Sequence, residues 1–128
     1  MRVLFVCVEN SCRSQMAEAF ARMHGAAVEA HSAGSRPSGA VNEKAVASMR
    51  EIGYDLATHR SKSLDEIPAG PFDVVVSMGC GDACPWVPAA RREEWAIPDP
   101  KAMEPDEFRK VRFEIARRVD ALLRTWRG

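Results

Sequence analysis

The sequence predicts a single doubly wound α/β domain, because strand and helix patterns alternate along its 128 residues. Two uninterrupted apolar runs, Arg2–Val8 and Phe72–Ser77, have the composition of strands that are covered on both faces. The segment Glu104–Arg127 carries apolar residues at helical spacing and predicts a long amphipathic helix. A chain of this length can bury one core and is too short for two, so we expect one domain spanning residues 1–128.

The first strand leads through a loop into a helix expected over Ser14–His24, with Ser14 as its cap and Gly25 as its stop. Arg91–Glu94 is predicted to be a solvated face. The remaining elements are expected, in chain order, as a strand at Val28–Ser32, a helix at Val41–Ile52, a short helix at Ser63–Ile67 and a further sheet position at Trp95–Ile97.

Composition argues against several classes of partner. Lys and Arg together number 18, as do Asp and Glu, so the net charge indicates neither a nucleic-acid nor a membrane surface. The apolar run Met1–Val8 is too short for a signal peptide or a membrane span, which predicts a cytoplasmic protein, and we expect a monomer. Cytoplasmic cysteines stay reduced, so the four present are expected to act as thiols.

The loop that follows the first strand has the features of an oxyanion site with a nucleophile. Cys7 ends the strand, and Arg13 stands six residues on, at the start of the helix. Such a loop can turn successive backbone N–H groups inward, and the helix dipole adds to their field. The arginine fork can hold two oxygens at once. The residues expected to bind the anion are Val8, Glu9, Asn10, Ser11, Cys12, Arg13 and Ser14.

The same field favours a thiolate over a thiol, which makes Cys7 the expected nucleophile. Ser14 can hydrogen-bond its sulfur, and Asn10 suits a left-handed bend in the loop. A free cysteine ending a strand is more often a small buried hydrophobe. The combination of Asn10, Arg13 and Ser14 at this spacing favours the catalytic interpretation, whereas Cys12 is expected to be a spectator.

The segment from Cys7 to Ser14 resembles the C-x5-R-S signature of low-molecular-weight protein tyrosine phosphatases and of the arsenate reductases that share their fold. The resemblance extends through Ser32-Ala33-Gly34, the Asp73-Val-Val-Val strand and Asp99-Pro100. It implies a four-stranded parallel sheet flanked by helices, with Asp99 as the general acid. Glu9 departs from the pattern, because relatives commonly have a small residue there and a carboxylate beside an anion site weakens binding unless it points to solvent.

Two features favour the reductase branch of this family. The phosphatases carry tyrosines after the Asp-Pro pair, whereas this chain continues Lys101-Ala102-Met103. The loop after the Phe72–Ser77 strand contains Cys80 and Cys84, and it resembles the redox segment of arsenate reductases. A spacing of three residues is too wide for the usual zinc knuckle, so no metal is expected.

The resemblance implies a thiol cascade that reduces arsenate to arsenite in arsenic detoxification. Cys7 attacks arsenate, and Cys80 then attacks the Cys7 sulfur. Cys84 finally attacks Cys80, which frees Cys7 and leaves a disulfide between Cys80 and Cys84. The implied external reductant is thioredoxin, and no bound cofactor is expected. Relatives commonly separate the two relay cysteines by more residues, which is a departure in this chain.

Three residues match positions that support the loop in some reductases of this family, in part through a bound potassium ion. They are Glu18, Ser32 and Lys62. The relatives have an acidic residue where Lys62 stands, so the Lys62 ammonium can replace the metal and support the loop by charge. The alternative is that Lys62 is an ordinary solvated charge.

Two other functions remain open on the sequence alone. A phosphatase hydrolysing phosphate monoesters through a Cys7 phospho-enzyme needs Cys7, Arg13 and Asp99 but neither relay cysteine. A non-catalytic module that senses arsenite through its thiols predicts binding without turnover, and it has no use for an oxyanion loop.

Overall fold

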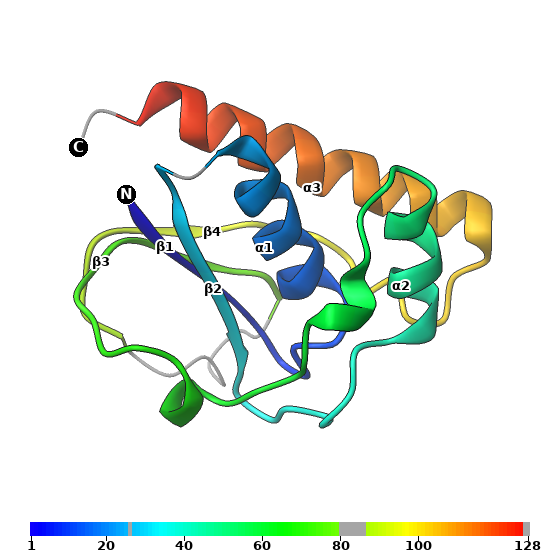
Figure 1. The fold of residues 1–128 in the computed structure, drawn as a ribbon, viewed down its shortest axis with the longest axis horizontal. Coiled ribbons are helices and arrows are strands. Elements are labelled where there is room, and N and C mark those ends of the chain that lie inside the picture. The colour runs from blue at the N-terminus through cyan, green and yellow to red at the C-terminus, as the bar shows by residue number, and fades with distance from the viewer. Residues whose placement is uncertain (26, 80–86, 127–128) are drawn as a thin grey trace.

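The computed structural model describes residues 1–25, 27–79 and 87–126, which form one parallel sheet with helices packed against it (Figure 1). The strands are β1 (Arg2–Cys7), β2 (Glu29–Gly34), β3 (Phe72–Ser77) and β4 (Ala89–Glu94). Their order is β2-β1-β3-β4, and every neighbouring pair is parallel. The predicted four-stranded parallel sheet is therefore confirmed.

The predicted position of the fourth strand was wrong. We expected it at Trp95–Ile97, but β4 ends at Glu94 and is formed by Ala-Ala-Arg-Arg-Glu-Glu. As an edge strand it is largely exposed, so its charged side chains remain in solvent and no apolar pattern marks it in the sequence. Trp95 and Ile97 are buried, which explains their strand-like composition.

The three α-helices are α1 (Arg13–His24), α2 (Glu43–Arg50) and α3 (Pro105–Thr125). Two 3-10 helices, η1 (Leu56–Thr58) and η2 (Leu64–Glu66), lie between α2 and β3, and the sequence predicted only the second. Figure 1 shows α1 and α3 side by side across the sheet, and residues of the two helices are in contact. Among the described residues, no helix has both the length and the apolar character needed to cross a membrane.

Alternate residues of β1 supply two hydrophobic clusters, as the period of a strand requires. Val3 and Phe5 join the larger cluster with apolar residues of all three α-helices, including Met16, Met49 and Ile115. Leu4 and Val6 face the opposite side of the sheet. There they pack in a smaller cluster with Ala33, Phe72, Val75 and Val87, against which Leu64 of η2 is packed. Because β1 is covered on both faces, its carboxyl end is held firmly.

The central strands β1 and β3 end side by side, since Val6 pairs with Ser77. The loop that leads to α1 therefore starts beside the segment that leaves β3. That segment continues through Met78 and Gly79, whereas Cys80 and Cys84 lie outside the described residues. Parallel sheets bind ligands at this edge, beyond the carboxyl ends of their strands.

Ile115 provides a test of the packing of α3. Its side chain is fully buried in the larger cluster, so Ile115→Ala is expected to lower the free energy of unfolding by about 3 kcal/mol. The matched control is Phe113→Ala on the same helix, because Phe113 is 61% exposed and its loss should change stability by less than about 0.5 kcal/mol. Urea unfolding measures both. Equal losses in the two variants would contradict this packing.

Candidate active site

The anion loop, defined as residues Cys7–Ser14, connects β1 to α1. Cys7 is the last residue of β1 and is almost fully buried. Asn10 has a φ of 51°, the left-handed bend that the sequence predicted at this position. Helix α1 begins at Arg13 with Cys12 as its N-cap, so the prediction that Ser14 caps the helix was wrong. Ser14 instead lies within the first turn, and its Oγ is 2.8 Å from the Cys7 Sγ.

The carbonyl oxygens of the anion loop point away from its centre toward the segment that follows β2. Val8 O accepts from the Arg36 N–H at 2.8 Å, Glu9 O from the Ser38 N–H at 3.1 Å and Ser11 O from the Asn42 N–H at 3.0 Å. Within the described part of the chain, the N–H groups of residues 9–12 donate to no protein atom. Unpaired amides beside a helix N-terminus form a binding site for an oxyanion.

Two glycines let other groups approach the loop closely. A Cβ on Gly34, at the end of β2, would lie 2.7 Å from Val8 O. Any larger residue at this position would therefore clash with the backbone of the anion loop. Gly79 follows β3 with a φ of +76°, and a Cβ on it would collide with the guanidinium of Arg13. The path of the loop therefore depends on glycine at position 34, and the position of the Arg13 guanidinium depends on glycine at position 79.

The side chains of Ser14, Asn10 and Gln15 form a series of hydrogen bonds that ends at the Cys7 sulfur. Asn10 Nδ2 donates to Ser14 Oγ at 2.7 Å, which leaves the hydroxyl hydrogen of Ser14 free to point at the Cys7 Sγ. Gln15 Nε2 donates to Asn10 Oδ1 at 2.9 Å and fixes the orientation of that amide. These contacts place a hydroxyl group directly against the sulfur of Cys7.

Gln15 is a site residue that the sequence analysis missed. Its side chain is fully buried, and Gln15 Oε1 is 2.9 Å from His59 Nδ1. A buried glutamine one residue after Ser14 is the signal that could have revealed it, because a buried amide must have hydrogen-bond partners. Burial lowers the pKa of His59, so this histidine is neutral at physiological pH and donates one ring N–H to Gln15.

Cys12 is a second cysteine of the anion loop, and its side chain is buried. Burial raises the pKa of Cys12 to about 12, although a hydrogen bond from Ser11 acts in the opposite direction. The side chain therefore remains a thiol at neutral pH and is a poor nucleophile. This supports the expectation that Cys12 is a spectator.

Arg13 and Asp99 lie close together despite being far apart in the sequence. Arg13 is buried, and its Nη1 donates to the carbonyl oxygen of Ile97 at 3.1 Å. Its Nη2 is 3.8 Å from Asp99 Oδ2. The Asp99 side chain is 47% exposed, so both solvent and a ligand bound at the loop can reach it.

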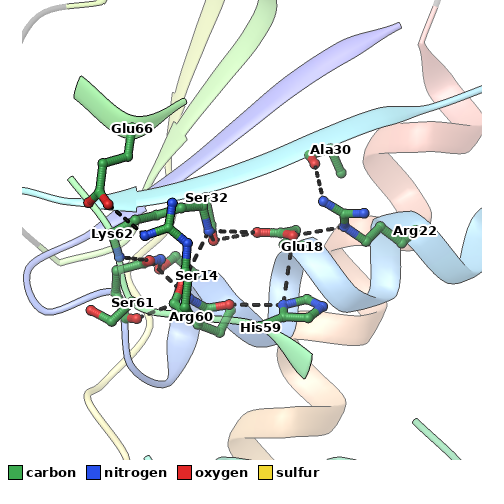
Figure 2. Close-up of polar contacts among 12 residues, drawn as sticks. Ser14, Glu18, Arg22, Ala30, Ser32, His59, Arg60, Ser61, Lys62 and Glu66 are labelled. Atoms are coloured by element: carbon green, nitrogen blue, oxygen red, sulfur yellow. Dashed lines mark hydrogen bonds and ion pairs between the residues drawn. The ribbon is translucent and has the colours of Figure 1, made fainter. Parts of the chain in front are cut away.

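Three of the residues predicted to support the loop meet in one cluster of polar contacts (Figure 2). This support cluster consists of Glu18, Ser32 and Lys62. The Glu18 side chain is 3% exposed, and its Oε1 accepts from Ser32 Oγ at 2.5 Å. Arg22 Nε donates to Glu18 Oε2 at 2.8 Å. Lys62 Nζ is 3.5 Å from Glu18 Oε1 and 3.4 Å from Ser32 Oγ. These three partners offset the cost of burying the Glu18 side chain so deeply.

The segment carrying Lys62 also holds the anion loop directly. Ser61 Oγ donates to Glu9 O at 2.8 Å, and the Lys62 N–H donates to Asn10 Oδ1 at 3.0 Å. Across residues 1–25, 27–79 and 87–126, no group of three or more His, Cys, Asp or Glu side chains is arranged to hold a metal ion.

Together these features place a buried thiol at the head of a loop with unpaired N–H groups at residues 9–12, and comparison with known proteins identifies the class of the protein. The model of the low molecular weight phosphotyrosine protein phosphatase family matches residues 2–127, and the chain belongs to this family. Among its relatives, a protein of Synechocystis sp. named glutaredoxin arsenate reductase is 39% identical over 125 residues, covering 95% of each chain. Arsenate reductase 1 of Staphylococcus haemolyticus is 38% identical, covering 96% of this chain and 95% of the relative.

Solved structures of arsenate reductases also match the chain. An arsenate reductase in a phosphate-binding state superposes with a TM-score of 0.87 at 39% identity, covering 96% of both chains. A thioredoxin-dependent arsenate reductase of Corynebacterium glutamicum has a TM-score of 0.77 at 30% identity, covering 97% of this chain and 60% of that one.

Lys62 provides a test of the support cluster. Lys62→Met removes an ammonium whose side chain is only 14% exposed, and it leaves Glu18 with less compensation. We expect a loss of about 1–2 kcal/mol in the free energy of unfolding, measured with urea. The matched control is Lys110→Met, which removes an exposed charge from α3. If both variants lose equally little, Lys62 is a solvated surface charge and does not support the loop.

Proposed function

We propose that this chain is an arsenate reductase that uses Cys7 as nucleophile and a thiol cascade to release arsenite. One observation carries the proposal: the Cys7 Sγ lies 2.8 Å from Ser14 Oγ, at the head of a loop in which the N–H groups of residues 9–12 donate to no atom of the described residues. The names of the relatives select the chemistry, because arsenate reductases match the chain over almost its whole length.

The first step forms a covalent adduct. The loop amides and Arg13 hold the arsenate oxygens, and the Cys7 thiolate attacks arsenic(V). Asp99 donates a proton so that one arsenate oxygen leaves as water. The product is a Cys7 thiol-arsenate in which arsenic is still pentavalent.

The second step carries the reduction. The Cys80 thiolate attacks the Cys7 sulfur, the As–S bonding pair stays on arsenic, and arsenite leaves as a Cys7–Cys80 disulfide forms. Cys84 then attacks Cys80, which frees Cys7 and leaves a Cys80–Cys84 disulfide. An external dithiol supplies the two electrons that restore both thiols.

The names of the relatives indicate two candidate reductants. The arsenate reductase of Corynebacterium glutamicum is named as thioredoxin-dependent, and the Synechocystis relative is named a glutaredoxin arsenate reductase. We favour thioredoxin, because a dithiol can resolve an internal Cys80–Cys84 disulfide without a second thiol donor. Since such reductants maintain reduced thiols in the cytoplasm, we propose that the enzyme acts there.

A phosphatase is the second candidate, and it needs the same nucleophile and acid. Family membership supports some hydrolysis of phosphate monoesters. The segment after Asp99-Pro100 carries Lys101 rather than tyrosine, so it offers no aromatic ring on which an aryl phosphate could stack. We therefore expect hydrolysis to be a residual activity.

The test is arsenate-dependent NADPH oxidation coupled through thioredoxin and thioredoxin reductase. Cys7→Ser, Cys80→Ser and Cys84→Ser are each expected to lower turnover at least about a thousandfold, because each removes an obligatory thiol. Asp99→Asn should lower kcat about a hundredfold through loss of the acid. Cys12→Ser is the matched control and should retain turnover within about threefold, since its thiol stays protonated.

Hydrolysis of p-nitrophenyl phosphate is measured alongside, and a parallel assay replaces thioredoxin with glutaredoxin and glutathione. Cys80→Ser and Cys84→Ser should leave any hydrolysis unchanged. Brisk hydrolysis without arsenate turnover under either reductant would make the chain a phosphatase and refute the proposal. Turnover with glutaredoxin alone would retain the reductase and replace the reductant.

A further inference from the structure

Glu9 presents an electrostatic problem within the anion loop. Its carboxylate belongs to a loop that must bind an oxyanion, and like charges repel there. The structure shows a partner on a distant segment: Lys101 Nζ lies 2.8 Å from Glu9 Oε2 and 3.2 Å from Glu9 Oε1. The ammonium therefore contacts both carboxylate oxygens and cancels the charge of Glu9 locally.

Lys101 is joined to the proposed general acid as well. Its backbone N–H donates to Asp99 Oδ1 at 3.1 Å, while Asp99 Oδ2 faces Arg13 Nη2 at 3.8 Å. Glu9, Lys101, Asp99 and Arg13 thus form a chain of alternating charge that begins and ends in the anion loop. Glu9 raises the pKa of Lys101 through a hydrogen bond and Coulomb attraction, so the ammonium is fully charged at neutral pH.

The segment that carries Lys101 is anchored on its other side by α2. Lys44 Nζ donates to the carbonyl oxygens of Lys101 and Met103, at 3.1 and 3.0 Å. The Lys101 side chain therefore forms a bridge from a segment that is anchored on α2 to the anion loop.

We propose that Lys101 is a positioning residue that determines oxyanion affinity: its ion pair with Glu9 cancels the negative charge at the site and holds the Asp99 segment against the anion loop. The role of Asp99 as acid depends on the proposed function, whereas the effect on anion binding does not. An isolated exposed ion pair would be expected to contribute little to stability, and this pair is half exposed. Its consequence is expected in ligand binding.

Removing the two charges separately should change anion binding in opposite directions. Lys101→Met leaves Glu9 unpaired beside the anion and weakens binding. Glu9→Gln leaves the ammonium of Lys101 unpaired and strengthens it. The double variant restores the neutral balance. A purely structural ion pair would instead give two losses of the same sign.

Inorganic phosphate is the probe, because it occupies an oxyanion site without being reduced. Its dissociation constant is measured from the protection of Cys7 against iodoacetamide, with the labelled cysteine identified by mass spectrometry. We expect the constant to rise about fivefold in Lys101→Met and to fall about threefold in Glu9→Gln. The double variant and Lys101→Arg should stay within about twofold of the wild type, because neutrality is restored or retained.

The matched control is Lys110→Met, which should leave phosphate binding unchanged. Raising the ionic strength from about 0.05 to 0.5 M should reduce the effects of both single variants, since exposed charges are screened. The same weakening in Glu9→Gln as in Lys101→Met, or no change in Lys101→Met, would overturn the proposal.

Arsenate kinetics separate the two parts of the role. The KM for arsenate should change in the same direction as the dissociation constant for phosphate. In contrast, kcat should fall about threefold to tenfold in Lys101→Met, in Glu9→Gln and in the double variant, because each of them loses the ion pair that positions Asp99. A kcat that recovers in the double variant would refute the positioning part. If no variant reduces arsenate, the proposed function fails, and the phosphate measurement still decides the role of Lys101.

Discussion

The anion loop can act only if its peptide N–H groups face the substrate, and that orientation depends on where its carbonyl oxygens are bonded. Backbone N–H groups of Arg36, Ser38 and Asn42 bind those oxygens from one side, and the Ser61 hydroxyl binds Glu9 O from another. With the carbonyls satisfied outside, the amides of residues 9–12 remain for an anion. A fixed array of donors needs no reorganisation when charge develops on the substrate, which is the main source of electrostatic catalysis.

The support cluster holds these anchors in place by charge. Glu18 on α1 binds Ser32 of β2 and approaches Lys62 of the segment that follows η1, so one buried carboxylate joins three parts of the chain. The neighbouring Lys62 N–H and Gln15 amide then fix Asn10, which in turn orients Ser14 toward the Cys7 sulfur. The Cys7 sulfur is thus connected to the packing of the sheet through a continuous series of hydrogen bonds.

Much of this could be predicted from the sequence, because the relevant signals are local. The buried strands β1 and β3, the helix after the anion loop and the left-handed Asn10 all follow from short patterns. Strand β4 could not be found in this way, because an edge strand needs no apolar side chains.

Contacts between distant segments were also beyond prediction. The Glu9–Lys101 pair joins residues 92 positions apart. The sequence shows that Glu9 departs from the family pattern, but it does not show that Lys101 neutralises the carboxylate. Lys62 left two interpretations open in the sequence, and its distances to Glu18 and Ser32 favour a supporting role. Cys80 and Cys84 lie outside the described residues, so their relay remains a prediction from the sequence and the family resemblance.

The central claim is that electrons flow from the protein's own thiols to arsenic. The most direct measurement is a single turnover of the fully reduced protein with excess arsenate and no external reductant, with arsenic speciation and thiol titration on the same sample. A cascade predicts one arsenite per chain, two of the four thiols lost and a disulfide between Cys80 and Cys84. Four intact thiols with all arsenic still pentavalent would contradict it.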